Sequence, residues 1–222
     1  MITNKNMPVK KLVLASLCWL AIFILHADLP LDMFPPGLFS QVEDEYGGDA
    51  RKRVERWQSL VVDTQDSPES DKLLRVNTFF NRIRFIDDIR VWKQEDYWAT
   101  PVEFLGRNAG DCEDFSIAKY FTLRALGISS EKLRLMYVRA LKLNRSHMVL
   151  AYFKEPNSMP LILDNINRKI LPADQRRDLQ PIYSFNGDGL WAAKAQGRGR
   201  KIRNKGGHSS WRAMMNRIEH NN

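Results

Sequence analysis

The chain has 222 residues, of which 44% are hydrophobic and 10% aromatic, and it carries a formal net charge of +8. This composition excludes an intrinsically disordered chain, and the length fits one domain with short appendages. The positive charge is concentrated at the two ends: three lysines lie in residues 1–27, and eight Lys or Arg against one Glu lie in residues 194–222. The body between them therefore carries −2, which argues against a nucleic-acid-binding domain.

Residues 1–27 have the pattern of an export signal. Lysines precede an apolar run from Leu12 to Leu25, which ends shortly before Asp28. This run is shorter than the about 20 residues that a membrane-spanning helix needs, so it favours a signal peptide. Leu25 occupies a position near the expected cut where a small residue is preferred, so an uncleaved anchor stays an alternative. Both interpretations predict an exported body.

Residues 28–193 are expected to form one domain that begins with helices. Prolines and glycines predict an extended or irregular entry segment over residues 28–50. Apolar residues then recur at helical spacing from Ala50 to about Thr64, and again from Leu73 to Ile83. The polar and aromatic residues 87–101 predict a loop.

A further helix is predicted after Gly110. Its apolar stripe continues to Gly127, which stands where a helix stop belongs. Asp111 is suited to cap the first turn, with Asp114 three residues later. This arrangement places Cys112 in the first turn of the helix.

The periodicity changes after this helix. Residues 133–137 alternate between apolar and polar, and residues 148–153 and 161–166 form short apolar runs, which predict strands. Helices followed by strands predict an α+β fold, in which an antiparallel sheet packs against the helix that carries Cys112.

Residues 194–222 are rich in Gly and Arg and show little apolar periodicity. This composition predicts a disordered basic tail. A solvated tail is the simpler interpretation, and contact with anionic lipid or with a partner is the alternative. Binding of the tail to nucleic acid ranks last, and no nucleic-acid partner is expected.

Cysteine and histidine are scarce in the body. Cys112 is its single cysteine, so no internal disulfide is expected after the signal is removed. His147 is its single histidine, because the other three lie in the signal or in the tail. A thiol and a base that takes its proton are the minimum for a thiol protease or an acyl transferase. The start of a helix would also stabilise the thiolate of Cys112.

Asp164 completes a candidate triad. If Phe153 pairs with Ser158 around the intervening loop, the antiparallel register places His147 opposite Asp164 on one face of the sheet. Asp164 would then orient the imidazole and stabilise its protonated form. Singly, each of these residues has an ordinary structural interpretation; together with Cys112, they favour catalysis.

Three carboxylates surround the thiol. Asp111, Glu113 and Asp114 would oppose formation of a neighbouring thiolate, so something should neutralise them. They are hard oxygen ligands of the kind that calcium prefers. Carboxylates at the start of a helix are also favoured by the helix dipole without any metal. These residues alone leave both interpretations open.

Three segments resemble the LapG family of bacterial transglutaminase-like cysteine proteinases. They are Gly110–Phe115 with Ala118–Tyr120, Ser146–Leu150 and Leu163–Asn165. The resemblance extends over about residues 85–192, and it implies a papain/transglutaminase-like fold. It also implies a site of defined composition. The catalytic triad would be Cys112, His147 and Asp164, and Ca2+ would be held by Asp111, Glu113 and Asp114.

The resemblance further implies a periplasmic protease that cleaves the N-terminal region of a large surface adhesin at a di-alanine-type site. Cleavage would release the adhesin and disperse biofilm, and an inner-membrane cyclic-di-GMP receptor (LapD-like) would sequester the protease. Two alternatives stay open: a transglutaminase or amidase that uses the same triad, and a non-catalytic calcium-dependent binding module. The tail has no counterpart in the family pattern.

Overall fold

A computed structural model describes residues 33–192, 199–203 and 209–220 of the chain. The α-helices are α1 (Leu38–Tyr46), α2 (Gly48–Thr64), α3 (Glu69–Phe80), α4 (Asp88–Val91), α5 (Pro101–Arg107), α6 (Cys112–Ala125) and α7 (Ser209–His220). The strands are β1 (Arg84–Phe85), β2 (Ala109–Gly110), β3 (Leu133–Ala140), β4 (Arg145–Tyr152), β5 (Leu161–Leu163), β6 (Leu171–Pro172), β7 (Leu179–Asn186), β8 (Gly189–Ala192) and β9 (Lys201–Arg203). Two 3-10 turns, η1 (Ser130–Lys132) and η2 (Ala173–Gln175), precede β3 and follow β6.

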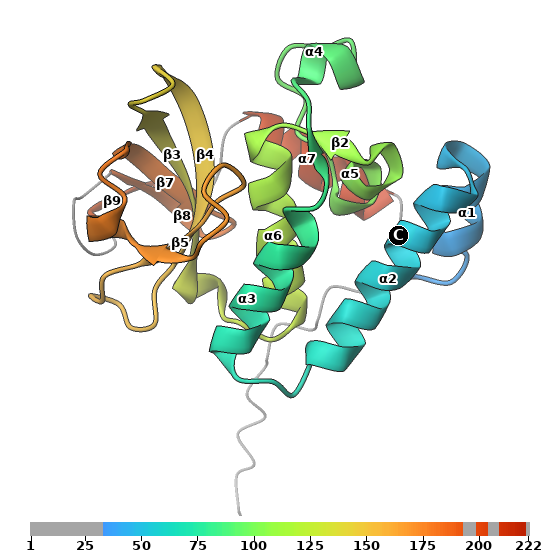
Figure 1. Cartoon of the computed structure of the whole chain (residues 1–222), viewed down its shortest axis with the longest axis horizontal. Helices are drawn as coiled ribbons and strands as arrows, with labels where there is room; N and C mark the ends of the chain where they lie inside the picture. Colours follow the sequence, from blue (N-terminus) through green and yellow to red (C-terminus); the bar gives the residue numbers. More distant parts are fainter. Residues whose placement is uncertain (1–32, 193–198, 204–208, 221–222) are drawn as a thin grey trace, which may run out of the picture.

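The strands form one large antiparallel sheet in the order β6-β5-β4-β3-β7-β8-β9. A separate parallel pair, β1 and β2, leads the chain into α6. The sheet lies on one side of α6, and α1, α2, α3 and α5 lie on the other (Figure 1). The chain therefore has the α+β architecture that the sequence predicts, with an antiparallel sheet packed against the helix that carries Cys112.

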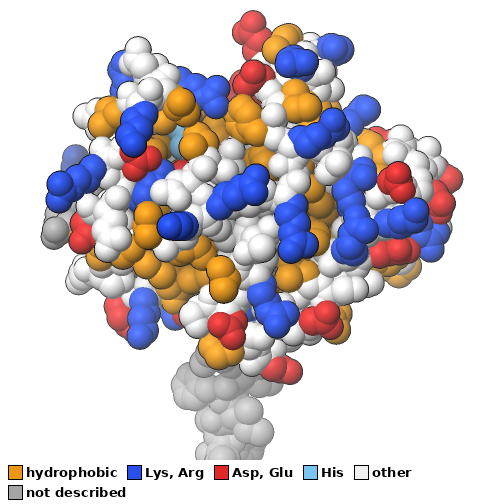
Figure 2. Space-filling view, viewed as in Figure 1, with side chains coloured by type: hydrophobic (Ala, Val, Ile, Leu, Met, Phe, Trp, Pro, Cys, Tyr) orange, Lys and Arg blue, Asp and Glu red, His pale blue; other side chains and the backbone are white. Residues whose placement is uncertain are grey.

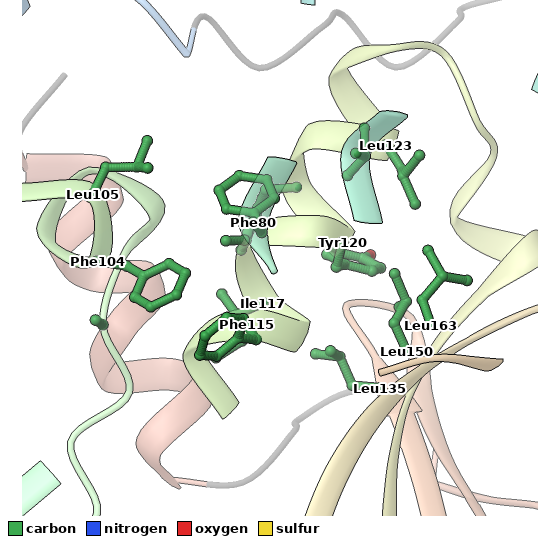
Figure 3. Packing of buried hydrophobic residues seen from close by; sticks show 14 of the residues in the cluster. Phe80, Phe104, Leu105, Phe115, Ile117, Tyr120, Leu123, Leu135, Leu150 and Leu163 are labelled. Atoms are coloured by element: carbon green, nitrogen blue, oxygen red, sulfur yellow. The ribbon is translucent and has the colours of Figure 1, made fainter. Parts of the chain in front are cut away.

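Helix α6 is enclosed by this arrangement. Every one of its residues except Arg124 is buried. Its side chains fill the space between Phe80 and Phe104 from the other helices and Leu135 and Leu150 from the sheet (Figure 3). Because a close-packed core tolerates little movement, α6 is a rigid platform for any group at its first turn.

Both ends of α6 are as predicted. Asp111 accepts a hydrogen bond from the Glu113 amide, and Asp114 accepts one from the Asp111 amide, which together form a capping box. At the other end, Gly127 has a φ of +84°, and the Ile128 amide donates to the Leu123 carbonyl at 3.0 Å. This left-handed glycine terminates the helix.

The prediction of an irregular entry segment is wrong from Leu38 onward, because α1 and the start of α2 occupy this part of it. The prolines lie before the helix, and Gly37, with a φ of +88°, sits at its N-cap. Leu38 and Val42 then bury one face of α1. The predicted loop over residues 87–101 also contains one short helix, α4.

The predicted disordered tail is wrong for residues 201–203 and 209–220. The first segment forms β9, and the second forms α7. Trp211 and Met214 are buried, and the Trp211 ring stacks on Phe121 with centroids 5.6 Å apart. Apolar residues three and four apart supply this face, which the surrounding Arg and Gly residues obscure in the sequence. Among the described residues, no helix is long and apolar enough to span a membrane.

The remaining predictions about the two ends of the chain concern residues outside the described part. The predicted signal peptide or anchor, residues 1–27, falls outside the described residues, as do residues 193–198, 204–208 and 221–222 of the tail region. The boundaries of the 28–193 domain stay predictions.

The register between β4 and β5 differs by two residues from the predicted one. Leu150 pairs with Leu163, whereas a Phe153–Ser158 pair would place Leu150 opposite Leu161. Ser158 instead closes a turn with Glu155, through its amide and the Glu155 carbonyl. Since side chains alternate with a period of two, a two-residue shift keeps each residue on its face. The consequence that mattered for the site, His147 and Asp164 on a common face, is unaffected.

Candidate active site and metal site

Cys112 is the first residue of α6 and lies at its junction with β4. Its side chain is only 8% exposed. The thiol donates a hydrogen bond to Glu113 Oε2 at 2.8 Å and accepts one from the Met148 backbone amide. The sulfur therefore contacts the residue that follows His147 in β4.

His147 is fully buried in β4. Its Nε2 lies 2.8 Å from Asp164 Oδ1, so a neutral ring that donates from Nε2 leaves Nδ1 as a base. Nδ1 is buried and has no hydrogen-bond partner among the described residues. The structure thus brings the three predicted catalytic residues to one junction of α6, β4 and β5, with the thiol hydrogen directed to Glu113 rather than to the imidazole.

Asp164 is held from three sides. Besides His147, its Oδ1 accepts from the Ile166 amide at 3.0 Å, and its Oδ2 accepts from Arg176 Nη2 at 2.7 Å. Arg176 is itself fixed by two hydrogen bonds to Asp178. Burial alone would raise the pKa of Asp164, but the His147, Ile166 and Arg176 contacts outweigh it and hold that pKa below its usual range. This carboxylate stays ionised.

The thiol has the opposite electrostatic environment. Burial raises the pKa of Cys112 well above its usual value, and the charges of Glu113 and Asp111 raise it further. The Met148 amide opposes this effect only in part. Without a neutralising cation, the resting sulfur is a protonated thiol and a poor nucleophile.

Asp88 joins two of the three predicted calcium ligands. Carboxylate oxygens of Asp88, Asp111 and Asp114 all lie within 4.8 Å of one another. Asp88 Oδ2 accepts a hydrogen bond from the Tyr97 amide, but its Oδ1 is buried and has no hydrogen-bond partner in the described part of the chain. Burial, followed by neighbouring negative charges, raises the pKa of Asp111 to about 10. Burial also raises the pKa of Asp88 to about 7, although the Tyr97 amide opposes it. Such a set favours a cation of hard character.

Glu113 lies on the thiol side of this set. One oxygen of each of Asp111 and Glu113 and the Cys112 sulfur also lie within 4.8 Å of one another. The other Glu113 oxygen accepts a hydrogen bond from the Tyr137 hydroxyl at 3.0 Å. Asp111 is common to both sets. The four residues Asp88, Asp111, Glu113 and Asp114 are called the acidic cluster below.

The close approach of β2 to α6 requires a glycine. A Cβ added at Gly110 would lie 2.2 Å from Asp114 Oδ2 and 2.8 Å from the Phe104 ring. The Asp114 carboxylate is fixed on its other side by the Ala99 amide, at 2.8 Å. Gly110 thus allows the chain to deliver Asp111 and Cys112 next to a buried carboxylate.

Sequence reasoning missed three residues at the site. Asp88 and Arg176 lie far along the chain from their partners and follow no spacing rule, and only the fold brings them in. Lys119 is fully buried in α6, where burial lowers its pKa to about 7 and the charge of Asp164 opposes that shift. In the sequence, the one sign that Lys119 would be buried is its position on the apolar face predicted for this helix.

The fold and the pairing of a buried imidazole with a carboxylate, beside a thiol in the first turn of a helix, define a cysteine protease of the transglutaminase-like class. A family model described as "Bacterial transglutaminase-like cysteine proteinase BTLCP" matches residues 45–178. The chain belongs to this family, and the predicted family and enzyme class are confirmed.

Solved structures agree with this assignment. Legionella pneumophila LapG, treated with EGTA, is 42% identical, with a TM-score of 0.73, and the match covers 82% of this chain and 95% of that one. The calcium-bound form of the same protein is 43% identical, with a TM-score of 0.71 and coverage of 81% and 97%. A further L. pneumophila LapG structure is 42% identical with a TM-score of 0.70, and covers 82% and 95%. No curated protein matches the chain.

Proposed function

We propose that this protein is a calcium-dependent cysteine endopeptidase with Cys112 as nucleophile, His147 as general base and acid, and Asp164 as the orienting carboxylate. One observation carries the proposal: a buried histidine has one nitrogen on an ionised aspartate and its other nitrogen unpaired, one residue from a contact to the thiol. A purely structural histidine would be expected to satisfy both nitrogens.

In the first half-reaction, the Cys112 thiol transfers its proton to His147 Nδ1, and the sulfur attacks the scissile carbonyl carbon. The carbonyl oxygen becomes an oxyanion, which backbone amides at the start of α6 stabilise. His147 then donates the proton to the leaving amine, the C–N bond breaks and a thioester remains. Asp164 stabilises the imidazolium throughout.

In the second half-reaction, His147 takes a proton from water, and the resulting hydroxide attacks the thioester carbonyl. The C–S bond breaks, the acid product leaves, and the proton returns to the sulfur. Hydrolysis therefore consumes one water and regenerates Cys112 and His147.

The acidic cluster fits calcium, because a buried Asp88 oxygen lacks a partner and the neighbouring carboxylates are hard ligands. Asp88, Asp111 and Asp114 would hold the ion, with Glu113 beside it. Bound calcium would supply positive charge that offsets the carboxylates and lowers the pKa of the thiol. A Glu113 carboxylate drawn toward the ion would no longer accept the hydrogen bond from the thiol. His147 would then be the acceptor of the thiol proton. The calcium-bound and EGTA-treated LapG structures support this assignment.

For the substrate, location and partner, the proposal takes what the resemblance to the LapG family and the signal pattern of residues 1–27 imply. The proposed substrate is the N-terminal region of a large surface adhesin, cut in the periplasm at a di-alanine-type site. Its release would disperse biofilm, and an inner-membrane, LapD-like cyclic-di-GMP receptor would sequester the protease.

The test compares wild type with Cys112→Ala on the N-terminal fragment of a large repeat adhesin from the same organism, with calcium present. We expect wild type to cut the fragment and the variant to leave it intact while keeping the wild-type circular dichroism spectrum. A parallel reaction contains a labelled primary amine. Incorporation of the amine without cleavage would overturn hydrolysis in favour of acyl transfer.

A further inference from the structure

Helices α2, α3 and α5 enclose a hollow of about 410 Å³ on the face shown in Figure 2. Lys and Arg side chains gather over α2 and α3 on this face. The hollow, called the basic hollow below, is lined by four cations, one acid, three apolar side chains and one amide: Lys52, Arg53, Arg56, Arg82, Asp49, Phe79, Ile83, Leu105 and Asn108. It is therefore a local concentration of positive charge on a body whose net charge is close to zero.

Two of the four cations have interaction partners within the protein. Arg53 donates to the Leu105 and Gly106 carbonyls at 2.6 and 2.8 Å, and Lys52 pairs with Asp49 at 3.1 Å. The pKa of Arg53 is lowered mainly by its burial; the charge of Asp49 opposes this shift, and the charges of Arg56 and Arg84 add to it.

The other two cations, Arg56 and Arg82, are free. Both are exposed, and neither forms an ion pair or a side-chain hydrogen bond within the part of the chain that the structure describes. Two unpaired guanidinium groups above an apolar floor can each bind a carboxylate in a bidentate manner.

The basic hollow is close to the nucleophile. Asn108 on its rim precedes Cys112 by four residues, so their Cα atoms lie within about 15 Å. The intervening stretch is fixed, because Arg84 Nε donates to the Asn108 carbonyl and β1 pairs with β2. Ala109 and Gly110, between Asn108 and Cys112, are buried, so a bound peptide must pass around this stretch, and five or more extended residues are needed to cover the distance to the thiol.

We propose that the basic hollow is a substrate exosite, which binds an acidic stretch with an apolar residue about five or more residues from the scissile bond. The proposal rests on the proposed proteolysis of a polypeptide. A concave site with an apolar floor fits a peptide better than a flat membrane surface. The arginine guanidinium groups are matched to its carboxylates.

The test uses two synthetic peptides that share a di-alanine cleavage segment. One carries flanking Glu and Leu residues at about five to ten positions from the cut on both sides, and the other carries Gln in place of each Glu. The calcium-loaded enzyme is compared with an Arg56→Glu, Arg82→Glu double variant. A matched control, Arg75→Glu with Lys154→Glu, makes the same charge change at exposed residues outside the hollow.

We expect wild type to cleave the Glu peptide with a kcat/KM about 10-fold higher than the Gln peptide, through KM, and salt to reduce this preference. The double variant should lose the preference and keep its kcat on the Gln peptide, whereas the control variant should retain it. Equal cleavage of both peptides by wild type, or equal loss in the control, would overturn the exosite alone. Cleavage of neither peptide would overturn the proposed function and the exosite with it.

The competing interpretation is that the basic hollow is a membrane-binding surface, and anionic vesicles test it. Sedimentation with phosphatidylglycerol vesicles should show no difference between wild type and the double variant. Vesicle binding that the double variant loses and the control keeps would overturn the exosite in favour of a membrane-binding surface.

Discussion

Asp164 and the acidic cluster both belong to the site around Cys112, but they have different electrostatic surroundings. Asp164 has His147 and Arg176 as cationic or donor partners, and its pKa is held below the usual range. The acidic cluster contains no cationic side chain, and the pKa values of Asp88, Asp111 and Asp114 are raised. The charge of Asp164 is thus balanced within the chain, whereas the acidic cluster can be neutralised only by protons or by a bound cation. This difference explains how a metal could switch on a thiol that it need not contact.

Removal of calcium should have the largest effect on activity. Chelation with EGTA is expected to reduce cleavage by about 1000-fold, because the unneutralised cluster keeps Cys112 protonated. Cleavage of the adhesin fragment is measured after chelation and after return of Ca2+ or Mg2+, and only Ca2+ should restore it. Full activity in excess chelator would show that the acidic cluster needs no metal.

The pH dependence of calcium affinity is the second largest expected effect, and it should distinguish the acidic cluster from Asp164. Protonated carboxylates must lose protons to bind the ion, so affinity is expected to rise about 100-fold from about pH 6 to about pH 8. Isothermal titration calorimetry in buffers of different ionisation enthalpy would also detect the released protons. An affinity that is constant over this range would contradict raised pKa values in the metal-free cluster.

The signs of the stability effects are opposite for the two groups. The raised pKa values mean that the metal-free folded protein binds more protons than the unfolded chain, so the cluster costs stability as the pH rises above about 4. The lowered pKa of Asp164 contributes stability above about pH 4, and this contribution is lost as the pH falls further. Thermal unfolding, followed with and without calcium from below to well above about pH 4, measures both contributions to stability.

Substitution of Asp88 tests whether it belongs to the cluster. Asp88→Asn should weaken calcium binding by about 30-fold, since it removes a charged oxygen ligand. The matched control is Asp87→Asn, because the Asp87 side chain is exposed and its ion pair among the described residues is a 4.0 Å contact with Arg145. The calcium concentration for half-maximal activity is the readout. Equal effects of the two substitutions would remove Asp88 from the site.

Arg176→Met tests the surroundings of Asp164 and should have the smallest effect on activity. We expect kcat to fall about 10-fold and the acid limb of the pH profile to move to higher pH, because Asp164 loses a cation that keeps it ionised. The free energy of unfolding should fall by about 3 kcal/mol, as is typical when one partner of a buried pair is removed. Calcium affinity should not change.

The control for Arg176 is its exposed neighbour, Arg177. Arg177→Met should leave kcat, the pH profile and stability at wild-type values. A fall in calcium affinity in the Arg176 variant alone would mean that the two carboxylate groups are coupled, and the contrast between them would then fail.

Local patterns predicted the elements around the nucleophile well, because their causes are local. The Asp111 cap, the length of α6 and the stop at Gly127 depend on residues within a few positions of one another. The α1 and α7 helices were missed, since Pro and Gly or Arg-rich neighbours hide short apolar faces whose burial partners are distant. Phe121 and Phe185, for example, cover Trp211.

The sequence by itself determined the chemistry: one body cysteine at a helix start, one body histidine and a nearby aspartate, in the order of a known protease family. Only the tertiary structure decided which groups complete the site, because Asp88, Arg176 and Tyr137 are brought in by strand pairing and helix packing. The basic hollow has the same origin. Its charges lie on α2 and at Arg82, just after α3, and they cancel in the net charge, so they become a site only when the two segments lie side by side.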